Sequence, residues 1–205
     1  MIAILDYGRG NLGSVEKAFH RVGVQAVVTQ APRVVREAQA LVLPGDGAFH
    51  DAMANLASLD LLEPLREALA GGRPFLGICL GYQLLFSESE EFGHGKGLDL
   101  IPGVVRRFPR GVKVPHMGWN QVVHGGDLVL FDGIPSGAHF YFVHSYYPEP
   151  LDAALGVATC QYGVGFAAAV SKGRLFGTQF HPEKSQRWGL KLLENFARIA
   201  VETRR

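Results

Sequence analysis

The first half of the chain alternates short apolar runs with segments of helical periodicity. We predict strands at residues 2–5, 26–28, 40–43 and 74–78, and helices at residues 11–22 and 80–86. Short runs that are apolar throughout are typical of strands buried on both faces. The alternation therefore predicts βα units that build a mostly parallel sheet covered by helices on both sides.

The second half of the chain has a different pattern. Strand-like runs separated by turns rich in glycine and proline lie at residues 103–108, 140–143, 155–161, 166–171 and 175–180. Such closely spaced runs favour antiparallel pairing. Residues 188–201 carry apolar side chains at helical spacing, which predicts a closing helix packed on the sheet. We expect a single α/β domain over residues 1–205, with a parallel core and an antiparallel extension.

The composition is that of an ordinary globular protein. Of 205 residues, 47% are hydrophobic and 19% charged, with a formal net charge of +1. The basic residues form no long run, so we expect no nucleic-acid binding. The N-terminal segment lacks a basic lead-in and no apolar run is long enough to span a bilayer, which predicts a cytoplasmic protein without membrane binding. Two cysteines, no CxxC pair and no HExxH motif predict no metal and no cofactor.

Cys79 stands between an apolar strand and a helical segment, with Gly77 and Gly81 two positions to either side. A nucleophile elbow needs glycines there, because the sharp strand-to-helix turn brings backbone against backbone. At a helix N-terminus, the unpaired N–H groups favour the reactive thiolate. The alternative is a buried structural cysteine, a common core residue. For Cys160, inside a strand-like run, the core interpretation is favoured.

His181 and Glu183 follow the last predicted strand, separated by Pro182. A cysteine nucleophile needs a base, and the base needs a group that fixes its tautomer. Residues two apart in an extended chain face the same side, and Pro182 favours extended geometry at His181. Glu183 is therefore positioned to accept the imidazole N–H that faces away from the thiol. The alternative is a surface turn.

Acyl transfer also needs donors directed at the developing oxyanion. One is the backbone N–H of Leu80, directly after the nucleophile. The segment that holds Gly45 and Asp46 offers a second, because it follows a predicted strand and lies at the carboxyl edge of the sheet, where open α/β folds bind ligands. The alternative for this PGDG segment is a generic turn.

Taken together and in this order, the segments 44–47, 77–81 and 181–183 resemble the class I glutamine amidotransferases. The segments 6–12, 115–120, 143–146 and 181–185 are similar, more narrowly, to the glutaminase subunits of imidazole glycerol phosphate synthase from histidine biosynthesis. The resemblance covers nearly the whole chain. It implies the three-layer, flavodoxin-like fold of that family, with a central, mostly parallel sheet and an antiparallel extension.

The resemblance implies a reaction and a substrate. Cys79 attacks the amide of glutamine, His181 takes and returns the proton, and Glu183 orients His181. A glutamyl thioester forms, ammonia leaves, and water releases glutamate. The residues implied to contact glutamine are Gln83, Glu91, His144, Ser145 and Tyr146.

The resemblance also implies a partner. In the family, ammonia passes directly to a barrel-shaped cyclase subunit, which makes imidazole glycerol phosphate and AICAR, so we expect a heterodimer. The face implied to meet the cyclase carries Asn11, Trp119, Tyr141 and Lys184. Tryptophan and tyrosine are common interface anchors, although either also occurs in cores.

Two departures from the family pattern and two alternatives remain at this stage. Asp46 stands where relatives often have valine, and Tyr82 where methionine is frequent. Because a carboxylate beside the oxyanion would oppose the chemistry, we expect Asp46 to point outward. One alternative function is a glutaminase for guanylate, anthranilate or pyridoxal phosphate synthesis. The other is an interaction protein with an elbow cysteine and no glutamine turnover.

Overall fold

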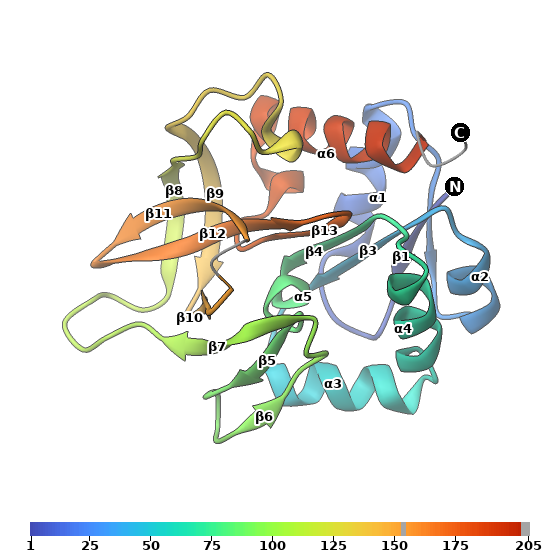
Figure 1. The fold of residues 1–205 in the computed structure, drawn as a ribbon, viewed down its shortest axis with the longest axis horizontal. Coiled ribbons are helices and arrows are strands. Elements are labelled where there is room, and N and C mark those ends of the chain that lie inside the picture. The colour runs from blue at the N-terminus through green and yellow to red at the C-terminus, as the bar shows by residue number, and fades with distance from the viewer. Residues whose placement is uncertain (153–154, 202–205) are drawn as a thin grey trace.

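A computed structural model of the protein describes residues 1–152 and 155–201. The largest sheet is formed by β1 (Ile2–Leu5), β2 (Ala26–Thr29), β3 (Ala40–Gly45), β4 (Phe75–Cys79), β11 (Gly156–Tyr162), β12 (Val164–Lys172) and β13 (Leu175–Thr178). These seven strands lie in the order β11-β12-β13-β4-β3-β1-β2 (Figure 1). The pairs from β13 to β2 are parallel, whereas β12 and β11 extend the sheet with antiparallel pairs.

Helices cover both faces of this sheet. They are α1 (Leu12–Arg21), α2 (Pro32–Glu37), α3 (Phe49–Ser58), α4 (Leu62–Ala70) and α6 (Gln186–Val201). Figure 1 shows α1 and α6 on one side of the sheet and α2, α3 and α4 on the other. The predicted three-layer α/β fold is confirmed.

The two faces of the sheet have separate cores, which explains the apolar strand pattern. Ile4 of β1 packs in the same core as Phe19 of α1, whereas its neighbours Ala3 and Leu5 pack in the other core with Leu65 of α4. Successive strand residues point to opposite faces, so a strand with helices on both sides needs apolar residues at every position. All four residues of β1 are buried.

Two smaller sheets stand beside the central one. The first, in the order β10-β7-β5-β6, and the second, the β8–β9 pair, lie on the side of β12 and β11 (Figure 1). Their strands are β5 (Phe86–Ser89), β6 (Gly95–Lys96), β7 (Ile101–Arg107), β8 (His116–Val122), β9 (Ala138–His144) and β10 (Tyr146–Pro150), and two 3-10 helices are η1 (Val129–Phe131) and η2 (Pro182–Lys184). Within the described residues, no helix combines the length and apolarity required to cross a membrane.

Two sequence predictions about this region are wrong. The helix predicted over residues 80–86 is a single turn, α5 (Leu80–Gln83), and the chain enters β5 at Phe86. Residues 84–86 are all buried, so they lack the polar face of a surface helix, and Phe86 pairs with Ile101 of β7 instead. The second half is also not wholly antiparallel, because β13 pairs in parallel with β4.

Candidate active site

Cys79 lies at a sharp turn between β4 and α5. Its backbone has φ 56° and ψ −106°, in a region that residues other than glycine rarely adopt. A Cβ at Gly81 would lie 1.7 Å from the carbonyl oxygen of Leu43, and one at Gly77 would lie 2.6 Å from the carbonyl oxygen of Gly81. Both glycines are therefore required by close backbone contacts, as the elbow motif predicts. Because α5 is one turn long, its dipole contributes less to thiolate formation than a full helix would.

The elbow opens into a cavity of about 360 Å³, a volume that suits a small polar ligand. The cavity brings together predicted site residues from distant parts of the chain: Asn11, Asp46, Cys79, Leu80, Gln83, Glu91, His144, Ser145, Tyr146, His181 and Lys184. Its position at the carboxyl ends of β3 and β4 is the usual ligand site of an open α/β sheet.

His181 and Glu183 are in direct contact, as their two-residue spacing predicts. His181 Nδ1 lies 2.8 Å from Glu183 Oε1, and both side chains are buried. Burial by itself lowers the pKa of His181, but the negative charge of nearby Cys79 and the bonded carboxylate of Glu183 raise it to about 10. His181 Nε2 and Glu183 Oε2 are buried without a hydrogen-bond partner among the described residues. The imidazole of His181 is therefore charged near neutral pH, and it lies beside Cys79.

A buried amide also contacts Cys79. Gln179, directly after β13, is completely buried, and its Nε2 lies 3.6 Å from Cys79 Sγ. Its Oε1 accepts a hydrogen bond of 3.0 Å from Gln83 Nε2. Gln83 also donates to the carbonyl of Tyr146 at 2.9 Å. A row of polar groups thus connects the cavity wall to the sulfur.

A second buried histidine centre lies on another wall of the cavity. His144 Nδ1 donates to the Tyr146 carbonyl at 2.8 Å, and its Nε2 lies 2.9 Å from His116 Nδ1. His116 Nε2 lies 3.2 Å from Asn120 Nδ2. Burial lowers the pKa of His116 to about 4 and is the main cause that lowers the pKa of His144 to about 3. These two imidazoles are neutral at physiological pH, and hydrogen bonds occupy all their ring nitrogens.

The segment with Gly45 and Asp46, predicted to stabilise an oxyanion, lies directly against the elbow. Gly45 pairs with Cys79 in the β3–β4 register, and a Cβ at Gly45 would come within 3.1 Å of the Leu80 Cβ. Asp46 is exposed at the cavity mouth, where its carboxylate accepts a hydrogen bond of 3.1 Å from the Gly10 N–H. The hydroxyl of Tyr7 lies next to Gly45, where it is buried and has no hydrogen-bond partner in the described part of the chain. Burial, with smaller effects of the Cys79 and Asp46 charges, raises the pKa of this phenol far above its usual range.

The remaining residues predicted to contact glutamine lie around the same cavity. Glu91 accepts a hydrogen bond of 2.7 Å from the backbone N–H of Phe49, at the start of α3, so one of its carboxylate oxygens is occupied. Ser145 lines the cavity, and its carbonyl accepts a bond from the N–H of Phe108. The side chain of Glu91 is half-buried.

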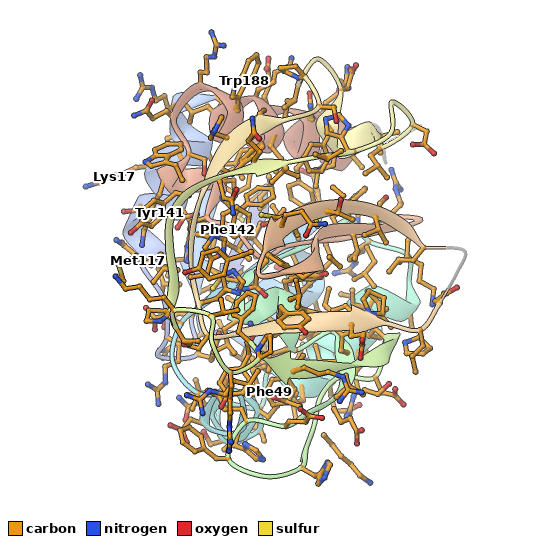
Figure 2. All side chains as sticks on the ribbon, turned by 90° about the vertical axis from the view of Figure 1, so that its left-hand side faces the viewer. Lys17, Phe49, Met117, Tyr141, Phe142 and Trp188 are labelled. Carbon is orange, nitrogen blue, oxygen red and sulfur yellow. The ribbon has the colours of Figure 1, made fainter. Side chains whose placement is uncertain are left out.

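The four residues predicted to face a partner lie on one side of the molecule. Trp119 of β8 is 47% exposed and packs edge-to-face with Tyr141 of β9, with ring centroids 6.1 Å apart. Neighbouring Met117 is 62% exposed. In Figure 2, Met117 and Tyr141 lie at the edge of the molecule and Phe142 points inward. Asn11 caps α1 through a bond to the Ser14 N–H, and Lys184 is exposed in η2.

Sequence reasoning missed three residues of the site: Tyr7 and Gln179, which lie near Cys79, and His116, which contacts His144. For Gln179 a signal existed, because strand periodicity places residues 179 and 181 on the same side. The contacts of Tyr7 and His116 depend on how distant segments meet. No group of three or more potential metal ligands occurs within residues 1–152 and 155–201.

The family model described as glutamine amidotransferase class-I matches residues 3–200. The chain is similar to the imidazole glycerol phosphate synthase subunit HisH of Moorella thermoacetica, with 54% identity over 97% of this chain and 94% of that protein. It is also 54% identical to HisH of Syntrophotalea carbinolica, over 96% of this chain and 98% of that protein.

Solved structures show the same fold at low sequence identity. A glutamine amidotransferase crystal structure superimposes with a TM-score of 0.78, at 18% identity and 98% coverage of both chains. A putative GMP synthase component from Thermoplasma acidophilum gives a TM-score of 0.72 at 21% identity, over 99% of this chain and 94% of that one. With the family match and the close relatives, the chain belongs to the class-I glutamine amidotransferases, in the family of the HisH subunits of imidazole glycerol phosphate synthase.

Proposed function

We propose that this protein hydrolyses glutamine with the triad Cys79, His181 and Glu183 and passes the ammonia to a cyclase subunit in histidine biosynthesis. One observation carries the proposal: the elbow cysteine and the His181–Glu183 pair, about 100 residues apart in sequence, meet at one cavity. The family membership and the 54% identity to HisH proteins support the same reaction. Residues 1–205 then form a single catalytic domain that works in the cytoplasm.

The first half of the reaction starts from the thiolate and imidazolium pair. Cys79 Sγ attacks the carboxamide carbon of glutamine, and the oxygen of that carboxamide becomes an oxyanion. The N–H of Leu80 and the peptide between Gly45 and Asp46 provide donors for it. His181 then gives its proton to the amide nitrogen, the C–N bond breaks, and ammonia leaves a glutamyl thioester on the sulfur.

The second half regenerates the enzyme. His181, now neutral, removes a proton from water as that water attacks the thioester carbon. The C–S bond breaks, glutamate leaves, and the thiolate and imidazolium are restored. Glu183 holds His181 through Nδ1, so that Nε2 faces the sulfur in both halves.

The cavity has groups for the other end of glutamine. We propose that the carboxylate of Glu91 attracts the α-ammonium group through the oxygen that Phe49 does not occupy. The backbone of residues 144–146 binds the α-carboxylate, and the Gln83 side chain lies beside the scissile amide. Since His144 is neutral, it positions the Tyr146 carbonyl without adding charge to the pocket.

The partner face is proposed to be the surface around Asn11, Trp119, Tyr141 and Lys184. Two observations support it. Trp119 and Met117 of β8 are exposed. Their strand pairs with β9, whose Val143 and His144 line the same cavity as Lys184 and Asn11. Large exposed apolar side chains grouped in this way are typical of interaction surfaces.

Glutamate release from glutamine tests both parts of the proposal, measured for the chain alone, with the cyclase subunit, and with the cyclase and its nucleotide substrate. We expect the highest rate in the last mixture. Cys79→Ala should abolish glutamine-dependent synthesis, while the complex still uses added ammonia. Loss of both activities would mean that Cys79 is structural, and no release in any mixture would reject the glutaminase.

Trp119→Ala tests the partner face. It should weaken cyclase binding by about tenfold or more, as truncation of an aromatic anchor does. Val201→Ala is a matched control, because Val201 is 60% exposed but ends α6 on the opposite side of the molecule from β8 (Figure 1). Equal binding by both variants, measured by isothermal titration calorimetry, would exclude this face.

A further inference from the structure

Gln179 is the one fully buried amide in contact with the nucleophile among the described residues. Its side chain has no exposure, and its Nε2 lies 3.6 Å from Cys79 Sγ, within hydrogen-bonding range for sulfur. The backbone of Gln179 is itself fixed, because its N–H donates to the carbonyl of Ala168 on β12 at 2.7 Å. The amide therefore has little freedom to move away from the sulfur.

The orientation of this amide follows from a backbone carbonyl. The carbonyl oxygen of Tyr146 only accepts hydrogen bonds, so the group of Gln83 that lies 2.9 Å from it must be the NH₂. The same NH₂ lies 3.0 Å from the Gln179 side chain, which must present its oxygen there. The NH₂ of Gln179 is then the group that faces the sulfur. The hydrogen-bond network thus fixes the positions of the oxygen and the nitrogen in both side-chain amides.

A donor directed at a sulfur stabilises its anion more than its protonated form. Two titratable groups lie near Cys79: His181, which follows β13, and Tyr7, which follows β1. The His181 imidazolium gives up its proton during the reaction, whereas the Gln179 amide keeps its N–H throughout. Only the amide is a constant donor to the sulfur when the thioester breaks.

We propose that Gln179 is a catalytic residue whose side-chain N–H bonds to the Cys79 thiolate, favours its formation and holds Sγ in position for attack. This rests on the proposed function, in which Cys79 is the nucleophile. Gln83 has a supporting role, because its side-chain NH₂ bonds both to the Tyr146 carbonyl and to the Gln179 amide and so fixes the orientation of that amide.

The test uses Gln179→Met, which keeps an unbranched side chain of similar size and removes both polar groups. The rate of alkylation of Cys79 by iodoacetamide is followed against pH by mass spectrometry of the peptide that contains it. We expect the midpoint of the profile to move upward by about one pH unit, as loss of a hydrogen bond to a charged group implies. In the complex with the cyclase, kcat for glutamine should fall about tenfold or more, with a smaller change in KM.

Two further variants keep the test decisive. Thr178→Val is the matched control: it removes a buried hydrogen bond, from Thr178 Oγ1 to the Phe180 carbonyl, on the adjacent residue without touching the sulfur. It should leave the alkylation midpoint unchanged. Gln179→Asn keeps an amide but is one methylene shorter, so it should shift the midpoint as the methionine variant does, even if the latter folds poorly.

An unchanged midpoint in Gln179→Met and Gln179→Asn would overturn the role of Gln179, as would an equal shift in Thr178→Val. Neither result would overturn the proposed function, which is tested separately by glutamate release from the unmodified complex and by the activities of Cys79→Ala. The two failures are therefore distinguishable.

Discussion

Two buried histidine centres border the same cavity, and they have opposite electrostatic character. His181, beside Glu183 and Cys79, has a pKa raised to about 10, whereas burial lowers the pKa of His116 to about 4 and that of His144 to about 3. Burial is common to all three. The charge state is therefore decided by the neighbouring groups: the Glu183 carboxylate and Cys79 in one centre, a carbonyl and a second imidazole in the other.

The two centres also differ in how completely their polar atoms are bonded. Every ring nitrogen of His116 and His144 has a partner. On the catalytic side, the buried atoms without a partner among the described residues are His181 Nε2, Glu183 Oε2 and Tyr7 Oη. Unsatisfied buried groups cost stability, so these three atoms are a less favourable arrangement than the fully bonded nitrogens of the other centre. The neutral pair instead acts as rigid support.

Replacing one histidine in each centre should give the largest contrast. His181→Asn removes the base, and glutamine hydrolysis by the complex should fall by about 10³-fold or more. His116→Asn alters only the support of His144, so glutamine hydrolysis by the complex should fall by less than about tenfold. Steady-state glutamate release measures both, and comparable losses would contradict the division of roles.

Glu183→Gln keeps the shape of the orienting group and removes its charge. The imidazolium of His181 would lose its charged partner at 2.8 Å, so its pKa should fall, and turnover should drop by about 10²-fold or more. Titration of the His181 ring by NMR measures the first effect. A pKa that remains near 10 would show that Cys79 alone sets it, in which case Cys79→Ala should lower it.

The neutral pair should make the fold sensitive to acid. The folded pKa values of His116 and His144 lie below the usual value of about 6.5. At pH values between the folded and unfolded pKa, the unfolded chain therefore binds more protons than the folded protein. This contribution to stability is present above pH 6.5 and is lost as pH falls toward 4. At pH 5 the loss is of order 2 kcal/mol per histidine.

Urea unfolding at pH 7 and pH 5 measures this loss, and His116→Asn should reduce the difference between the two values. For His181 the sign is reversed, because its pKa is raised: its contribution is complete below pH 6.5 and is lost as pH rises toward 10. Unfolding free energies that stay constant from pH 7 to pH 5 would contradict the neutral pair.

The smallest expected effect concerns the unpartnered hydroxyl of Tyr7. Tyr7→Phe should leave the free energy of unfolding unchanged or raise it by up to about 1 kcal/mol, because it removes a buried group without a partner. Tyr82→Phe is the matched control: its buried hydroxyl bonds to the Ala167 carbonyl at 3.2 Å, so its loss should cost about 1 kcal/mol. Equal destabilisation of both variants would mean that Tyr7 has a partner.

The four parallel strands β1 to β4 and the elbow motif could be predicted from sequence for physical reasons. Strands buried on both faces leave unbroken apolar runs, and the elbow needs Gly77 and Gly81 because no Cβ fits beside the backbone there. Residues 84–86 were misleading, because an apolar run does not distinguish a buried strand from a buried helix. Strand β5 joins the small sheet by pairing with β7, a contact between distant segments that the sequence alone does not show.

Within the candidate site, sequence-based prediction is limited for the same reason. The His181–Glu183 contact is local, so two-residue spacing was enough to predict it. The contacts of Gln179 with Cys79 and of His116 with His144 join residues 100 and 28 positions apart, respectively. Such contacts, and the charge states that depend on them, follow only once the strands are placed.

The central claim is that Cys79 is acylated by glutamine, and trapping the thioester tests it most directly. The complex with the cyclase is mixed with isotopically labelled glutamine, quenched in acid within the first turnovers, and digested for mass spectrometry. The account predicts a glutamyl adduct on Cys79 in the unmodified protein and in Glu183→Gln, none on Cys160, and none in Cys79→Ala. Sustained glutamate release by Cys79→Ala, or an adduct on another residue, would contradict it.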